Sequence, residues 1–367
     1  MPSLESLGWN SHFESQLRSS EGDLVPARVA EEQRGSYRVL CPEGLWYAEL
    51  AGRLRHEAAE AATMRPCVGD WVLVRLSPAA GSAGEAAGGM AVIHRVLERR
   101  TRFSRRAAGN RSVEQVIAAN VDTVFLVQSL NRNLNTRRVE RYLALLWESG
   151  AEPVVVLSKA DLCPDPASLI EEVEAVASGA SVHSVSALTE GGLDPLRAYL
   201  GPGKTAALVG SSGVGKSTIV NALAGSDLLR VEAIREADDR GRHTTTARHL
   251  VLLPGGGLLL DTPGMRTVMM WEGEEGLSQT FQDVEAIVAG CRFRDCTHQA
   301  EPGCAVQGAL EAGTLDPARF RSYVKLQREI LHEAKKTDRR LRMAEQRRWR
   351  RIAMEQRRRP DKRHLRH

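Results

Sequence analysis

The first residues of the chain lack the long apolar run that a signal peptide or a membrane span requires. Four acidic side chains, Glu5, Glu14, Glu21 and Asp23, are spread over residues 1–23. No stretch between them is apolar enough for secretion or membrane insertion. We therefore expect a cytoplasmic protein with no membrane contact.

Cysteine is also scarce, with six in 367 residues. Cys41, Cys67 and Cys163 stand alone, whereas the other three lie close together near a histidine. In a reducing compartment this clustering favours a metal site over disulfides.

Aromatic residues make up only 5% of the chain, and the formal net charge is only +4. The charge is unevenly placed, because residues 335–367, here called the basic tail, hold 15 Lys and Arg against 4 Asp and Glu. The tail thus carries +11 and the remaining chain −7. Such a tail suits phosphate neutralisation on RNA, with base stacking limited mainly to Trp349, although most charge runs are simply solvated.

The length allows two or three domains. After an N-terminal extension at residues 1–23, short β-rich runs separated by turn residues predict a small barrel at 24–105, with an OB-fold favoured. OB surfaces commonly bind RNA. The predicted strands lie near residues 26–30, 36–40, 45–50, 70–76 and 90–96.

From residue 113 to 275 apolar strand-like segments alternate with helical ones. This alternation predicts a mostly parallel sheet with helices on both faces. Beyond it, residues 276–334 carry the cysteine cluster and a helix that Asp316 caps and Pro317 opens,.

The sequence GSSGVGKS at residues 210–217 follows a predicted strand and precedes a predicted helix. In this motif backbone N–H groups surround the phosphates of a nucleotide, Lys216 reaches the terminal phosphates, and Ser217 ligates Mg²⁺. The nucleotide contacts are expected from Gly210, Ser211, Ser212, Gly213, Val214, Gly215, Lys216, Ser217 and Thr218.

Downstream, LLLDTPG places Asp261 at the end of an apolar strand, where it can hold the metal through water,. Gly264 can then offer its N–H to the γ-phosphate. Between the two motifs GRHTTT, at residues 241–246, resembles a switch loop, and Thr245 or Thr246 is expected to complete the Mg²⁺ shell,.

The base is predicted from SKAD at residues 158–161, which resembles the Asn-Lys-x-Asp motif of GTPases. Asp161 can accept hydrogen bonds from N1 and the exocyclic amine of guanine, and Lys159 can lay its stem along the base. Ser158 replaces the usual Asn, so a contact bracing the base against the phosphate loop is expected to be missing. Ser186 and Ala187 resemble the backbone clamp on the guanine O6.

The motifs occur in an unusual order, with the guanine motif before the phosphate loop. Because all of them are loops at one edge of a parallel sheet, the chain can be cut and rejoined elsewhere without losing the site. A circularly permuted GTPase domain is predicted.

Three cysteines and a histidine, Cys291, Cys296, His298 and Cys304, follow with C-x4-C-x-H-x5-C spacing. They supply four ligands and leave no open position, which is typical of one structural Zn²⁺.

In combining these features the sequence resembles the family of ribosome small subunit-dependent GTPase A, over nearly the whole chain. The segment QVIAANVD at residues 115–122 and the GRHTTT loop share in the likeness. The resemblance implies an OB-fold, a permuted GTPase domain and a zinc domain. It also implies hydrolysis of GTP during late maturation of the small ribosomal subunit, strongly stimulated by that subunit and its rRNA. A monomer is expected.

Catalysis needs a residue that aligns the attacking water, but Met265 follows Gly264 where many GTPases have Gln,. His243 is the candidate, with a solvated or packing histidine as the alternative reading of the sequence, and the resemblance points to the same residue. Two other functions stay open: a GTP-regulated RNA-binding module in which hydrolysis is incidental, and a P-loop kinase or ATPase, which Asp161 disfavours.

Overall fold

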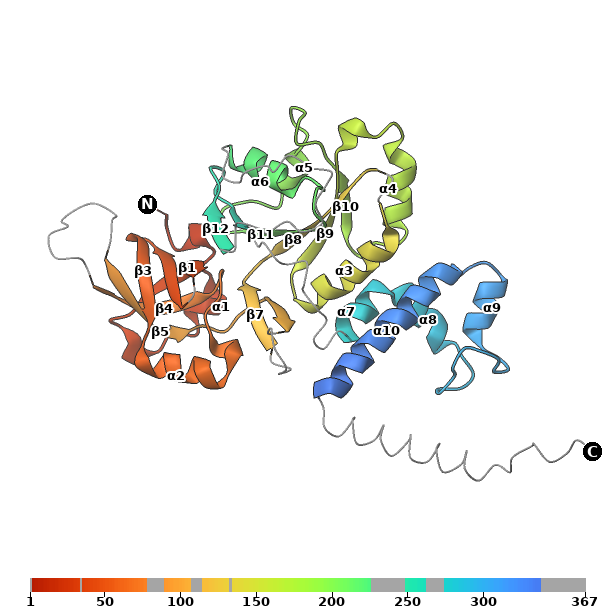
Figure 1. Cartoon of the computed structure of the whole chain (residues 1–367), viewed down its shortest axis with the longest axis horizontal. Helices are drawn as coiled ribbons and strands as arrows, with labels where there is room; N and C mark the ends of the chain where they lie inside the picture. Colours follow the sequence, from red (N-terminus) through yellow and green to blue (C-terminus); the bar gives the residue numbers. More distant parts are fainter. Residues whose placement is uncertain are drawn as a thin grey trace, which may run out of the picture.

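The computed structural model describes residues 2–33, 35–77, 89–106, 114–131, 134–225, 248–261 and 274–337. These residues form a barrel, a central α/β unit and a helical unit, arranged in that order along the long axis of the molecule (Figure 1). No helix in this described part is both long and apolar enough to cross a membrane.

The N-terminal segment packs on the barrel. Leu7 and Phe13 are buried, and the ring of Trp9 meets Trp71 of the barrel edge-on at 4.9 Å between centroids. Its short helices are η1 (Glu5–Leu7), α1 (Ser11–Glu14) and η2 (Ser19–Glu21). These aromatic contacts fix the segment to the body of the protein.

Five strands form the barrel: β1 (Val25–Gln33), β2 (Ser36–Cys41), β3 (Gly44–Leu50), β4 (Trp71–Ser77) and β5 (Met90–Val96). Their neighbour order is β1-β2-β3-β5-β4, and the β1–β4 pairing closes the ring. Only β3 and β5 run parallel within it. Between β3 and β4 lie α2 (Gly52–Glu60) and η3 (Ala62–Met64). The predicted OB-like barrel is confirmed.

A two-stranded sheet follows the barrel, made of β6 (Arg102–Arg106) and β7 (Glu114–Ala119). The two strands are antiparallel and β6 pairs with β7 instead of joining the barrel. They link the barrel to the α/β unit.

The central sheet has the order β10-β9-β8-β11-β13-β12. Its strands are β8 (Thr123–Ser129), β9 (Glu152–Ser158), β10 (Ser181–Ser184), β11 (Thr205–Val209), β12 (Arg248–Leu252) and β13 (Leu258–Asp261). All are parallel except β12, which also pairs with β1 of the barrel. The barrel and the α/β unit therefore share one hydrogen-bonded sheet.

Helices cover both faces of the central sheet, as predicted. The apolar sides of α3 (Thr136–Glu148) and α4 (Pro166–Glu174) share one core with Leu126, while α5 (Asp194–Arg197) and α6 (Lys216–Ala224) share the opposite one with Phe125. Because Phe125 and Leu126 are neighbours on β8, their side chains point to opposite faces. A short 3-10 turn, η4 (Ala160–Leu162), follows β9.

The helical unit comprises α7 (Glu274–Thr280), α8 (Gln282–Ala289), α9 (Ala305–Glu311) and α10 (Pro317–Thr337). Phe281, Val284 and Tyr323 lie at its core. The Asp316 carboxylate accepts a hydrogen bond from the N–H of Ala318 at 2.8 Å, so the predicted cap forms,.

Candidate functional site

The phosphate loop connects β11 to α6, as the motif requires. Lys216 directs its ammonium back over the loop, 2.9 Å from the carbonyl oxygen of Gly210 and 2.6 Å from that of Ser211. Gly210 adopts φ +155°, and a Cβ there would lie 2.2 Å from the carbonyl oxygen of Val127. Only glycine fits, which explains the first glycine of the motif.

The SKAD segment lies at the end of the neighbouring strand β9 and touches the phosphate loop directly. Lys159, with φ 60°, places its ammonium 2.8 Å from the carbonyl oxygen of Gly213. Lys159 therefore joins the guanine motif to the phosphate loop, a contact that the sequence did not predict. That its stem lies along the base stays a prediction. Asp161 is exposed in the middle of η4, and its carboxylate can accept hydrogen bonds,.

Ser158 differs from the sequence-based expectation. Its hydroxyl oxygen lies 2.6 Å from the carbonyl oxygen of Val214 and 3.1 Å from that of Gln128. The sequence predicted that, without the Asn, this segment would make no bracing contact to the phosphate loop. Ser158 makes such a contact. The side chain is buried, so this bond is shielded from water,.

The predicted O6 clamp follows β10 and lies against the same region. The N–H of Ala160 donates to the carbonyl oxygen of Val185 at 3.1 Å. Ser186 is buried, and its hydroxyl accepts the N–H of Leu188 at 3.3 Å. SKAD, the clamp and the phosphate loop thus meet at the carboxyl ends of β9, β10 and β11.

The metal-binding and catalytic predictions are only partly placed. Asp261 ends β13, next to β11, but its side chain is not described. The predictions for His243, Thr245, Thr246 and Gly264 lie outside the described residues. Ser217 and Thr218 occupy the first turn of α6, where the helix N-terminus favours anions,.

Charged side chains join α3 to the helical unit, and motif analysis did not find them. Arg319 of α10 donates to the Glu140 carboxylate at 2.9 Å and to both oxygens of Asp283 at 2.6 and 2.7 Å. Burial raises the pKa of the Asp283 carboxyl, but the bonds and charge of Arg319 outweigh this and the pKa lies below its ordinary value,. The helical unit is therefore attached to the central unit through a buried ion pair on α3.

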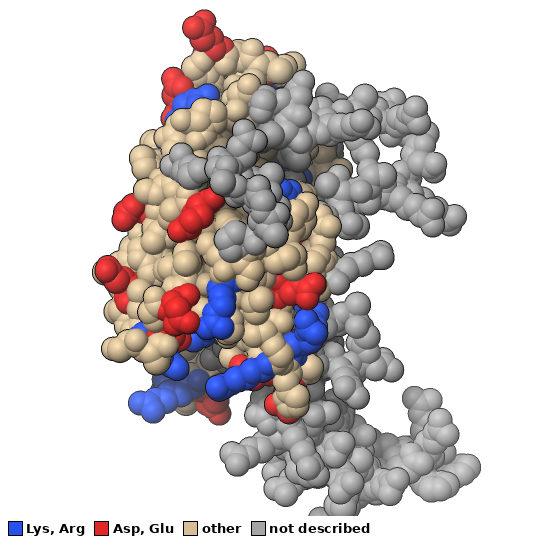
Figure 2. Space-filling view, turned by 90° about the vertical axis from the view of Figure 1, so that its left-hand side faces the viewer, with Lys and Arg blue, Asp and Glu red and all other residues tan. Residues whose placement is uncertain are grey.

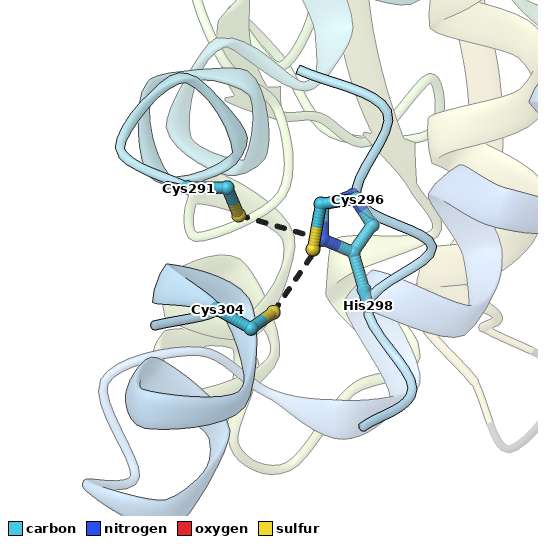
Figure 3. A group of neighbouring side chains, drawn as sticks. All are labelled: Cys291, Cys296, His298 and Cys304. Atoms are coloured by element: carbon cyan, nitrogen blue, oxygen red, sulfur yellow. Dashed lines mark hydrogen bonds between the residues drawn. The ribbon is translucent and has the colours of Figure 1, made fainter. Parts of the chain in front are cut away.

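The four predicted zinc ligands come together, although they are spread over 14 residues. Their ligand atoms all lie within 4.8 Å of one another, and the His298 Nδ1 is 3.5 Å from the Cys291 sulfur and 3.6 Å from the Cys304 sulfur (Figure 3). In a tetrahedral zinc site with bonds of about 2.1 to 2.3 Å, ligand atoms are about 3.6 to 3.8 Å apart. The cluster therefore has the size and chemistry that zinc requires.

This order of strands and loops defines a circularly permuted GTPase with an N-terminal OB-like barrel. A profile of the family described as "RsgA GTPase" matches residues 96–271. Two similar proteins, each named small ribosomal subunit biogenesis GTPase RsgA, come from Opitutus terrae, at 48% identity over 96% of this chain and 97% of that protein, and from Streptomyces avermitilis, at 45% over 96% and 92%. The chain belongs to the RsgA GTPase family.

Solved structures agree with this assignment. The crystal structure of YjeQ from Thermotoga maritima matches with a TM-score of 0.60 and 28% identity, covering 84% of this chain and 99% of that one. The crystal structure of YloQ, a circularly permuted GTPase, has the same fold, with a TM-score of 0.56 and 23% identity over 86% of this chain and 97% of that one. The permutation inferred from motif order is therefore confirmed.

Proposed function

We propose that this chain hydrolyses GTP to GDP and phosphate while it binds the small ribosomal subunit in the cytoplasm, during the maturation of that subunit. One observation carries the GTPase part: the guanine motif and the phosphate loop are joined by the bonds of Ser158 and Lys159 to Val214 and Gly213. The two relatives are named for small ribosomal subunit biogenesis, which supports the ribosomal part.

In this proposal the base is read by Asp161 and clamped by Ser186 and Ala187. Lys216 neutralises charge on the terminal phosphates, and Mg²⁺ bound by Ser217 with Thr245 or Thr246 adds to that neutralisation. Asp261 holds the metal through water, and Gly264 donates its N–H to the γ-phosphate. His243 orients the attacking water, a role that the Met265 thioether is poorly suited to fill.

We also propose that Cys291, Cys296, His298 and Cys304 hold one structural zinc ion. The close approach of His298 to two thiols supports a closed site,. Metal analysis of the purified protein should give one zinc per chain. Replacing Cys304 by Ser should lower that content strongly, whereas the same change at the isolated Cys163 should leave it unchanged.

Hydrolysis is tested by single-turnover assays with and without purified small subunits. We expect slow turnover alone and a large acceleration by subunits, because Met265 stands where many GTPases carry the Gln that aligns the water,. His243→Ala should remove most of the accelerated rate with little loss of GTP affinity. Equal rates with and without subunits would favour the alternative, a GTP-regulated RNA-binding module whose hydrolysis is incidental.

The barrel alone gives limited electrostatic support for RNA binding. Seen from the barrel side, basic and acidic side chains are interspersed, with the basic ones gathered toward the lower edge (Figure 2). A surface of mixed sign attracts RNA less than a uniformly basic one. The RNA contact therefore depends in good part on the basic tail.

A further inference from the structure

Three arginines occupy the first two turns of α3, and two of them already have acidic partners. Arg137 donates to Asp316 at 2.6 Å, and Arg141 pairs with Glu329 of α10. Arg138 instead directs its Nη1 to the Ser211 hydroxyl of the phosphate loop, at 3.2 Å. Successive residues of a helix are turned by about 100°, so Arg138 leaves the face that α10 covers.

The backbone of Arg138 is held in place by two contacts of α3. The Asn135 side chain caps α3 by accepting the N–H of Arg138 at 3.1 Å,. The buried Glu140, bonded to Arg319, anchors the same stretch of helix to α10. The guanidinium is therefore presented by a fixed helix, while its own head remains exposed.

Two cations meet at Ser211. The ammonium of Lys216 lies 2.6 Å from its carbonyl oxygen, and the guanidinium of Arg138 binds its hydroxyl. In a phosphate loop the lysine marks where the terminal phosphates bind. Arg138 thus contacts the same residue, Ser211, as the lysine that marks this position. No carboxylate in the described part of the chain pairs with Arg138.

A hydroxyl is a weak partner for a guanidinium. Phosphate oxygens carry charge and match the planar fork of arginine, so they form stronger bonds with it. When a triphosphate occupies the loop, its γ-phosphate offers such oxygens near Ser211. A diphosphate has no γ-phosphate and offers none there.

We propose that Arg138 is a γ-phosphate ligand that makes the site prefer GTP over GDP. This inference rests on the proposed GTPase function. The arginine exchanges the Ser211 hydroxyl for a γ-phosphate oxygen when GTP binds and returns to Ser211 after hydrolysis.

The test compares the affinities of full-length variants for GDP and for a non-hydrolysable GTP analogue, both with Mg²⁺, by calorimetry. Arg138→Ala should weaken binding of the analogue by about tenfold or more, as expected for loss of a charge-assisted bond. The affinity for GDP should change by less than about twofold in the same variant. Arg138→Lys, which keeps the charge but not the fork, should fall between.

Arg141→Ala is the matched control, because it removes one positive charge from the same helix away from the loop. It should leave the ratio of the two affinities unchanged. Equal losses for both nucleotides in Arg138→Ala would show that the arginine only supports the loop, and unchanged affinities would show no role; either result overturns the inference. Failure of the GTPase proposal is seen separately, as a lack of GTP hydrolysis by the unmodified chain.

Discussion

The hydroxyl of Ser158 contacts the phosphate loop from the position where the Asn-Lys-x-Asp motif of GTPases has an amide. It is buried at the end of β9 and lies 2.6 Å from the carbonyl oxygen of Val214. A serine is shorter than an asparagine, so the bond requires the phosphate loop to approach β9 closely. The loop meets this requirement, since Gly215 would place a Cβ only 3.9 Å from the Ser158 oxygen.

Ser158→Ala should therefore weaken the affinity for GDP and for GTP by a similar factor, about 3- to 15-fold. That range corresponds to loss of one buried neutral hydrogen bond. Both nucleotides are affected because the bond positions the base motif against the loop and does not reach the γ-phosphate. Titration with fluorescent GDP and GTP analogues measures the two constants.

Ser168→Ala is a suitable control, because Ser168 lies on α4 and bonds only locally to Asp165. It should leave both affinities unchanged. An unaltered affinity in Ser158→Ala would mean that the hydroxyl bond adds nothing to nucleotide binding.

Residue types at fixed spacing were enough to predict where the phosphate loop and the guanine motif lie in the fold. Gly210 to Ser217 and the SKAD segment are local motifs, and each lies where its pattern predicts. Arg138 was missed because no sequence spacing relates it to Ser211, 73 residues away. A usable signal existed: Asn135 caps a helix that starts just after β8, at the same sheet edge as the phosphate loop,.

At the scale of elements, the contact of α3 with α10 is a buried charge network. Arg319 and Glu140 are almost fully buried and bond to each other, and Asp283 is half-buried beside them. Arg137 and Arg319 both donate to Oε1 of Glu140, which pairs a charge that is costly to bury, while its Oε2 has no partner among the described residues,. The network fixes the helical unit to the helix that contacts the phosphate loop.

Replacing Arg319 by Met should destabilise the packing of α10 on α3 by about 3 to 5 kcal/mol, because Glu140 would keep a buried charge with fewer partners. Amide hydrogen exchange in α10 and α8 should rise, while exchange in the barrel strands stays unchanged. Arg141→Ala removes a more exposed pair with Glu329 and should cost about 0 to 1 kcal/mol,. Equal exchange in the two variants would contradict a special role of Arg319.

The pH dependence of the same contact follows from Asp283, whose folded-state pKa is lowered from 3.8. A lowered carboxyl pKa stabilises the folded state fully above the unfolded value. That contribution is lost as the pH falls below 3.8 through the folded-state pKa. The protection of α10 amides, measured as exchange relative to the intrinsic rate at each pH, should therefore be independent of this group near neutral pH. Protection should fall only in acid, and it should fall less in Arg319→Met.

Alternation and turn residues predicted the elements of the barrel well, since β1 to β5 coincide with the five expected runs. The N-terminal helices were not predicted, because segments of three or four residues show no helical period. Arg28 was also missed, although it is fully buried and donates to the carbonyl oxygens of Leu7 and Asn120. Burial lowers the pKa of Arg28 to about 10. A single Arg in a strand gives no sign that the tertiary fold will enclose it.

At the scale of the whole molecule, the charge is divided between a mildly acidic body and the basic tail. The part of the tail beyond α10, residues 338–367, holds 13 Lys and Arg against 4 Asp and Glu. Each phosphate that such cations neutralise releases a counterion, so the affinity for RNA falls as salt rises. The tail and the barrel can therefore be separated by their salt dependence.

A chain that ends at Thr337 keeps α10 whole and should bind RNA with a flatter plot of log K against log salt. The slope should fall by about 0.7 to 0.9 for each phosphate that the shortened chain no longer neutralises. A second variant, with the same thirty residues in shuffled order, keeps the charge and should keep the slope if attraction is electrostatic. Fluorescence anisotropy with a labelled RNA over a series of KCl concentrations measures all three chains.

GTP hydrolysis without subunits should be equal in the three chains, because the nucleotide loops lie in the central unit. If the shortened chain kept the original slope, the RNA contact would lie in the barrel and not in the tail. If only the shuffled chain bound RNA more weakly, the order of the tail residues would matter beyond their charge. Trp349 is among the residues whose position the shuffling changes.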